Sequence, residues 1–118
     1  MRLVYRADQA SAVVDRNHLV ISVQGAVNSG GWDRPDLWIR SNSFPEERTL
    51  EIRFVARPPA SNEVVVQTLL PIAVRKTLPL PRYGTAEVEI VTETNTLVVP
   101  IMRYRAPAPI PTPRPGSQ

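Results

Sequence analysis

Apolar and polar residues alternate with a period of two along most of this chain. Successive side chains of a β-strand point to opposite faces, so this pattern predicts strands that each bury one face of a sheet. No helical period separates the alternating segments, and we therefore predict an all-β fold. The apolar positions that carry the pattern are Leu19, Ile21, Val23, Leu50, Ile52, Phe54, Val64, Val66, Leu70, Val88, Ile90, Leu97, Val99 and Ile101.

Turn-forming residues divide the alternating segments into short strands. Gly, Pro, Asn, Asp and Ser gather between them, as in the turns of all-β domains. Short strands at this spacing favour an immunoglobulin-like antiparallel β-sandwich of about seven strands. The strands are predicted at about residues 2–6, 18–27, 36–41, 48–57, 63–74, 85–93 and 96–104.

Two prolines fall inside predicted strands, Pro71 and Pro100. Proline has no backbone N–H to donate to a ladder. We therefore expect both at sheet edges, at bulges, or where a strand changes sheet.

The 118 residues allow about one domain. We assign residues 1–105 to the β-sandwich and residues 106–118, which hold five prolines, to an extended proline-rich tail. Residues 1–102 carry ten arginines and one lysine against eleven carboxylates, so the basic excess lies in Arg103, Arg105 and Arg114. A nucleic-acid-binding domain normally has a basic face. We expect no sequence-specific nucleic-acid binding.

The chain contains no cysteine, which excludes disulfides, thiolate zinc sites and cysteine nucleophiles. No run of 18 apolar residues is present, so no transmembrane segment is expected as a helix.

The segment from residue 30 to 38 is the most distinctive part of the sequence. It begins with two glycines and holds both tryptophans. Loop tryptophan beside arginine is common on binding surfaces, and we take Trp32, Asp33, Arg34 and Asp36 as candidate binding residues. The alternative is packing, in which Trp38 fills the core and Trp32 closes its end.

Metal and catalytic interpretations are weaker. Asp33 and Asp36, with Asn28, could offer oxygen ligands to calcium, but Asx turns explain them equally and the alternating acids of a calcium loop are missing. The only histidine, His18, could act with Ser22 or Ser11 and Asp15, yet no turn presents a serine nucleophile. We predict no catalytic residues, no metal site and no cofactor.

Three segments resemble small bacterial β-sandwich proteins without an assigned role. They are Gly25-x-Val27-x-Ser29-Gly30-Gly31-Trp32-x-x-Pro35-x-Leu37, Phe54-Val55-Ala56-x-Pro58-Pro59 and Val66-Gln67-Thr68-Leu69-Leu70-Pro71-Ile72. The resemblance covers about residues 18–95. It implies a β-sandwich and no activity or catalytic residues.

The sequence favours a non-enzymatic binding or envelope-associated module whose partner is another protein. One alternative is a small hydrolase or metal-dependent enzyme that uses His18 and loop acids. Another is a protease inhibitor that presents a proline-rich loop at residues 57–62 or 78–84.

Overall fold

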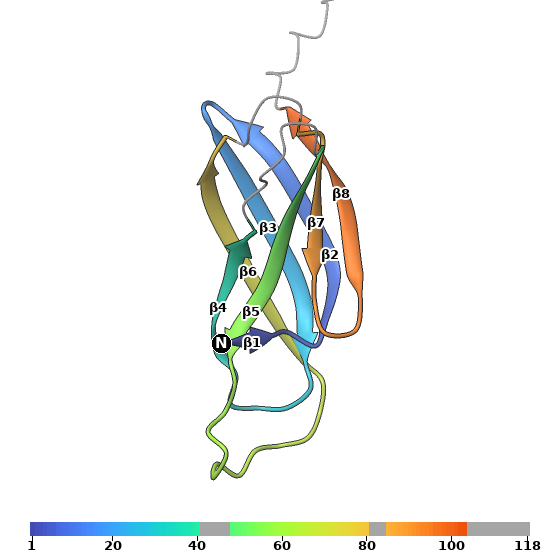
Figure 1. The fold of residues 1–118 in the computed structure, drawn as a ribbon. Coiled ribbons are helices and arrows are strands. Elements are labelled where there is room, and N and C mark those ends of the chain that lie inside the picture. The colour runs from blue at the N-terminus through green and yellow to red at the C-terminus, as the bar shows by residue number, and fades with distance from the viewer. Residues whose placement is uncertain (41–47, 81–84, 104–118) are drawn as a thin grey trace, which may run out of the picture.

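The computed structural model describes residues 1–40, 48–80 and 85–103, and these form eight strands without a helix (Figure 1). The predicted all-β class is confirmed. No helix in this part of the chain could cross a membrane. The predicted tail at residues 106–118 and part of the loop at 78–84 lie outside the described residues. The strands are β1 (Arg2–Leu3), β2 (Arg6–Asp15), β3 (His18–Val27), β4 (Asp33–Ile39), β5 (Thr49–Arg57), β6 (Leu70–Pro79), β7 (Glu87–Val91) and β8 (Thr96–Arg103).

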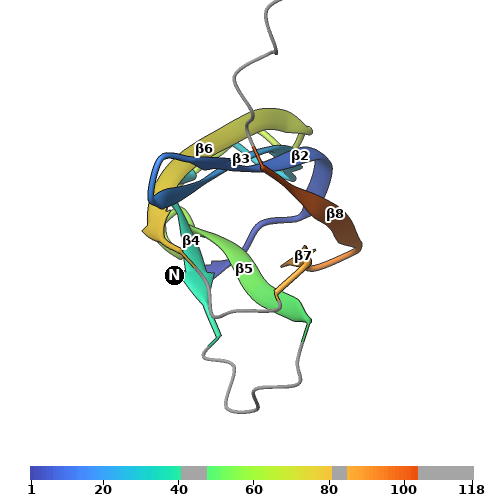
Figure 2. The ribbon, with the colours of Figure 1, turned by 90° about the horizontal axis from the view of Figure 1, so that it is seen from above.

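The strands belong to one curled sheet in the order β1-β5-β7-β8-β2-β3-β6, with β4 added to β5. Figure 2 shows β2, β3 and β6 on one side of the molecule, β4, β5 and β7 on the other, and β8 at the turn between them. The sheet is mixed, because β5 pairs with β7 and β2 pairs with β8 in parallel. The prediction of a purely antiparallel arrangement was wrong on this point: each parallel pair joins strands far apart in the sequence, which local patterning does not reveal.

Pro71 and Pro100, the two prolines of the predicted strands, lie where the missing N–H is tolerated. Pro71 is on β6, the last strand of the sheet. Pro100 ends the pairing of β8 with β7, and the pairing of β8 with β2 begins at the next residue, Ile101. Pro100 therefore marks the position at which β8 passes from one side of the curled sheet to the other, as expected.

The core lies between the two sides of the sheet and follows the predicted alternation. Ile52, Phe54, Leu19, Ile21 and Ile90 are fully buried. Leu97, Val99 and Ile101 of β8 are partly buried and pack against them. Each strand thus buries one face, which is the period-two arrangement that the sequence predicted.

Strand β2 was not predicted beyond residue 6. Its inward positions include Ala7 and Ala12, which are buried but small, and they alternate with residues such as Gln9 and Ser11. Alanine gives little hydrophobic contrast, so the period was weak. The strand is held instead by a tight hairpin to β3, in which Asp15 lies opposite His18.

Strand β6 lies further along the chain than predicted, at Leu70–Pro79 rather than 63–74. Its neighbour β3 ends at Val27, which is opposite Leu70, so the residues before Leu70 have no β3 partner. Val64, Val66 and Leu70, predicted as core positions, are 99%, 68% and 38% exposed. That part of the core prediction was wrong.

Candidate functional site

The loop between β3 and β4 is built around Ser29, which is buried. The indole Nε1 of Trp32 donates to Ser29 Oγ at 3.1 Å, and Ser29 Oγ donates to the carbonyl oxygen of Gly30 at 3.0 Å. Trp32 is half-buried and packs against the core. This position agrees with the packing interpretation of Trp32, since both its ring and its N–H are engaged within the fold.

Trp38 does not fill the core, contrary to the packing alternative. Its side chain is 47% exposed, whereas the preceding Leu37 is fully buried. Neighbouring residues of a strand point to opposite faces, so a buried Leu37 places Trp38 outside.

Asp33 forms an ion pair with Arg57 on β5. Arg57 Nε donates to Asp33 Oδ1 at 2.7 Å, and Arg57 Nη2 donates to Asp33 Oδ2. The hydrogen bonds from Arg57 lower the pKa of Asp33 below its ordinary value of 3.8. This carboxylate therefore joins β4 to β5.

The side chain of Asp36 points from β4 toward β6, the strand at the other edge of the sheet. Its Oδ1 accepts a hydrogen bond from Lys76 Nζ at 2.9 Å and another from the backbone N–H of Leu37 at 2.7 Å. The hydrogen bond from Lys76 is the main cause that lowers the pKa of Asp36. The structure thus directs Asp33 and Asp36 to different partners, and among the described residues no group of three potential metal ligands is present.

Arg34 is the one member of the predicted set that is exposed and has no ion pair with a described residue. Its φ of 50° lies in the left-handed region, which is uncommon for residues with a side chain. Of the four predicted binding residues, Arg34 keeps its charged group available to a partner.

The alternative catalytic site at His18 and the alternative inhibitory loop at 57–62 lie on other parts of the chain. His18 is exposed at the first position of β3, and Ser22 follows four residues later on that strand. Four residues of strand span roughly 13 Å, which separates these two side chains beyond hydrogen-bond reach. In the loop at 57–62, Pro58 and Pro59 are half-buried, whereas Ala60, Ser61 and Asn62 are exposed.

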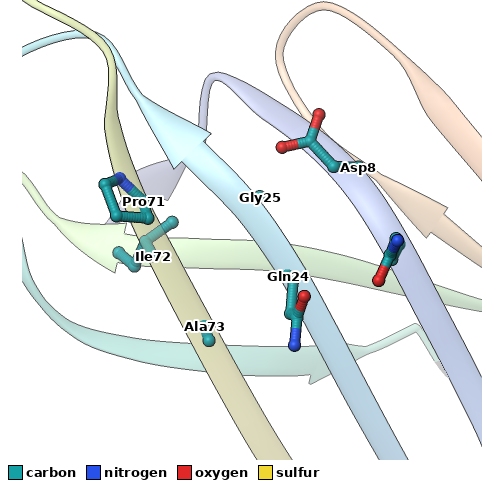
Figure 3. Close-up of a pocket in the computed structure, with 7 residues that line it drawn as sticks. Asp8, Gln24, Gly25, Pro71, Ile72 and Ala73 are labelled. Atoms are coloured by element: carbon teal, nitrogen blue, oxygen red, sulfur yellow. The ribbon is translucent and has the colours of Figure 1, made fainter.

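A second surface, which the sequence did not indicate, lies on the outer face of β2, β3 and β6. Three adjoining hollows there have volumes of about 440, 130 and 520 Å³. Neighbouring hollows share lining residues, first Gln9 with Gln24 and then Ser11 with Ser22. We call this continuous surface the polar strip. Its polar lining residues are Asp8, Gln9, Ser11, Asp15, Ser22, Gln24 and Arg75, and its apolar ones include Pro71, Ile72, Ala73 and the opposed pair Val13 and Val20. Figure 3 shows its first hollow, with Asp8 and Gln24 on β2 and β3 and Ala73 on β6.

Hairpin register aligns the polar side chains of the strip. Gln9 lies opposite Gln24, and Ser11 lies opposite Ser22. No hydrogen bond between described residues uses the side chains of these four residues. Each glutamine amide offers two donor hydrogens and an acceptor oxygen, and each serine offers a hydroxyl. The strip therefore presents a row of free donors and acceptors.

A β-bulge bounds one end of the strip, at the register shift between Ala7 and Gln9. Gly25 lies opposite Ala7, and a Cβ atom at Gly25 would come within 2.0 Å of the carbonyl oxygen of Arg6. Only glycine permits the two backbones to come this close. The bulge shifts the pairing by one residue so that Gln9 faces Gln24.

No protein-family model, curated protein or solved structure matches this chain.

Proposed function

We propose that this protein is a non-enzymatic binding module whose polar strip binds an extended polypeptide. The observation that carries the proposal is the row of amide and hydroxyl side chains, Gln9, Ser11, Ser22 and Gln24, that make no hydrogen bond to described residues. Glutamine amides match the donor and acceptor groups of a peptide backbone. An extended peptide lying along the strands could use several of them at once.

The shape of the strip supports an elongated ligand rather than a small molecule. All lining residues of the three hollows belong to β2, β3 and β6, so no opposing wall from the described residues closes over the strip. Small-molecule sites usually bury most of their ligand in a concave cleft. The strip runs from Asp8 to Asp15, which is roughly 23 Å of strand, or about seven residues of extended peptide.

The immunoglobulin-like arrangement expected from the sequence is part of this proposal. The two facing sides of the curled sheet support it, although the parallel pairs β5–β7 and β2–β8 depart from the antiparallel pattern. A binding role through a sheet face does not require the standard strand order.

The test is selection of peptides from a random library on the full chain, followed by affinity measurement with two variants. Ser22 lines two hollows, and Ser22→Arg places a long side chain in the middle of the strip. Thr96→Arg is the control, since Thr96 is exposed at the start of β8 outside the strip. We expect Ser22→Arg to lower the affinity for the selected peptides at least tenfold, equivalent to about 1.4 kcal/mol. Thr96→Arg should leave this affinity unchanged.

The variant Arg34→Ala distinguishes peptide binding at the polar strip from peptide binding at Arg34. If the selected peptides lose affinity with Arg34→Ala and not with Ser22→Arg, the binding surface is the start of β4 around Arg34. Failure of the library to yield any peptide that binds the folded chain would contradict peptide binding as a whole.

A further inference from the structure

The loop between β5 and β6, residues 58–69, projects beyond the strands at one end of the molecule (Figure 1). It is longer than most connections between successive strands, and connections of this length often carry a binding function. Val64 of this loop is 99% exposed, more than any other large apolar residue in the described part of the chain. The loop therefore presents one small apolar side chain completely to solvent.

The backbone of Gly31, between β3 and β4, supports this loop. A Cβ atom there would come within 2.7 Å of Pro59 Cβ, 2.8 Å of Glu63 Oε2 and 2.9 Å of Val65 Cγ1. The φ of 86° at Gly31 is also one that residues with a side chain rarely adopt. Residues before and after Val64 therefore pack directly on a backbone that only glycine leaves open.

Two backbone hydrogen bonds fix the chain on either side of Val64. The N–H of Glu63 donates to the Ala60 carbonyl oxygen at 2.9 Å and closes a β-turn. The N–H of Gly30 donates to the Val66 carbonyl oxygen at 2.9 Å. The segment that carries Val64 is thus held to the rest of the fold at both ends.

The chain from Val64 to Val66 has the alternation of an extended segment. Val65 is half-buried, and the valines on either side of it are exposed. No hydrogen bond between described residues uses the N–H or the carbonyl oxygen of Val64 or Val65. These peptide groups are therefore free to pair with the backbone of another protein.

We propose that this loop binds in the substrate cleft of a serine endopeptidase and inhibits it, with Val64 in the specificity pocket. Such a pocket selects one side chain by size and charge, and valine fits a small apolar pocket rather than an acidic or a wide one. A loop that is already held in its bound shape loses little entropy on binding, and inhibitors of this kind move little in their complexes. The surface is separate from the polar strip, which is lined by β2, β3 and β6.

The contacts with Gly31 distinguish an inhibitor from a substrate. The endopeptidase would cut the peptide bond between Val64 and Val65, and in a flexible loop the two new ends would separate. Here Glu63 before this bond and Val65 after it both pack on Gly31. Both sides of the bond are therefore held in place, which favours inhibition over release of a cleaved product.

Inhibition assays of the full chain test the proposal with three purified serine endopeptidases, whose pockets prefer small apolar, basic and aromatic side chains. We expect the parent chain to inhibit only the first. Val64→Lys should weaken this inhibition about thirtyfold or more, as loss of a central hot-spot residue does, and should create inhibition of the second. Val98→Lys is the matched control, because Val98 is 55% exposed on β8, and it should inhibit as the parent does. No inhibition by the parent chain at about 10 µM, where a complex of micromolar affinity is largely formed, or the same change in both lysine variants, overturns the proposal.

Removal of one anchor tests the rigidity of the loop. Val65→Ala deletes a side chain that packs on Gly31, whereas Val66→Ala deletes an exposed side chain and keeps the backbone hydrogen bond to Gly30. We expect the small-pocket endopeptidase to cleave Val65→Ala after Val64, as measured by mass spectrometry, and to leave Val66→Ala and the parent intact over the same period. Unfolding midpoints close to that of the parent would confirm that both variants are folded. Rapid cleavage of the parent, or equal resistance of the two variants, would contradict the anchoring on which the proposal depends.

Discussion

Lys76 on β6 and Asp36 on β4 join the two strands that end the curled sheet on either side. Lys76 Nζ lies 2.9 Å from Asp36 Oδ1 and donates to the Leu37 carbonyl oxygen at 3.1 Å. β4 and β6 share no backbone pairing. One side chain, the only lysine of the chain, therefore holds the two edges together at this point.

Removing the amino group of Lys76 should loosen this closure. Lys76→Met keeps most of the apolar stem but loses the ion pair and the hydrogen bond to Leu37. A partly exposed ion pair contributes up to about 1 kcal/mol and a hydrogen bond about 1 kcal/mol. We expect a loss of about 1 to 2 kcal/mol in the free energy of unfolding, measured with urea. Arg53→Met, at an exposed position without an ion pair to a described residue, is the control and should cost less than about 0.5 kcal/mol.

The same contact predicts a pH dependence. The hydrogen bond from Lys76 lowers the pKa of Asp36 in the folded chain below its ordinary value of 3.8, against an opposing effect of desolvation. A lowered folded-state pKa adds stability that is complete above the unfolded pKa and is lost as pH falls through the folded pKa.

We therefore expect the stability difference between the parent chain and Asp36→Asn to be constant from neutral pH down to about 5 and to shrink below about 4. Urea unfolding at several pH values measures this difference. A difference that persists unchanged at pH 2 would show that the charge of Asp36 is not what stabilises the closure.

The burial pattern of β5 predicts unequal effects at neighbouring positions. Ile52 is fully buried, whereas Glu51 is half-buried and pairs with the exposed Arg40 at 3.2 Å. Ile52→Ala should cost about 2 to 5 kcal/mol, and Glu51→Ala less than about 1 kcal/mol. Denaturant unfolding that gave equal costs would contradict the observed facing of this strand.

The two tryptophans should also differ. Trp32 packs against the core and bonds to Ser29, whereas Trp38 is 47% exposed. Trp32→Ala should cost about 3 kcal/mol, and Trp38→Ala less than about 1 kcal/mol. Emission spectra of the single variants provide a second measurement: the chain that retains only Trp38 should show the more solvent-exposed fluorescence. Reversed costs would place Trp38, not Trp32, against the core.

Strong alternation was sufficient to predict much of the fold. Large apolar residues at every second position identified β3 and the inward faces of β5 and β7, because their contrast with polar neighbours is high. The same rule places the side chain of Trp38 on the solvent-facing side of β4, because its neighbour Leu37 is buried. It failed where contrast was low, at Ala10 and Ala12 of β2. It also failed at the strand-like segment from Val64 to Thr68, which pairs with no strand in the part of the chain that the structure describes.

The polar strip could not be predicted for a related reason. Its glutamines and serines lie on two strands, and only the hairpin register places Gln9 opposite Gln24 and Ser11 opposite Ser22. Because β2 was not recognised beyond residue 6, no pairing between these residues could be inferred. Asp33 and Asp36 of β4 were recognisable as charged, but their partners Arg57 and Lys76 come from strands distant in the sequence.

Gly25 provides the sharpest test of the bulge that aligns the strip. A Cβ atom there would lie 2.0 Å from the Arg6 carbonyl oxygen and 3.1 Å from Ala7 Cα, both backbone atoms that cannot rotate away. Gly25→Ala must therefore separate β2 from β3 at the bulge, and overpacking of this kind typically costs about 1–3 kcal/mol. Gly30→Ala is the matched control, because its nearest atoms lie at an ordinary contact distance of 3.8 Å. We expect Gly25→Ala to lower the unfolding midpoint strongly and Gly30→Ala to change stability by less than about 1 kcal/mol. Similar stabilities for the two variants would mean that β2 and β3 do not approach each other this closely at Gly25, and that the facing of Gln9 and Gln24 has another cause.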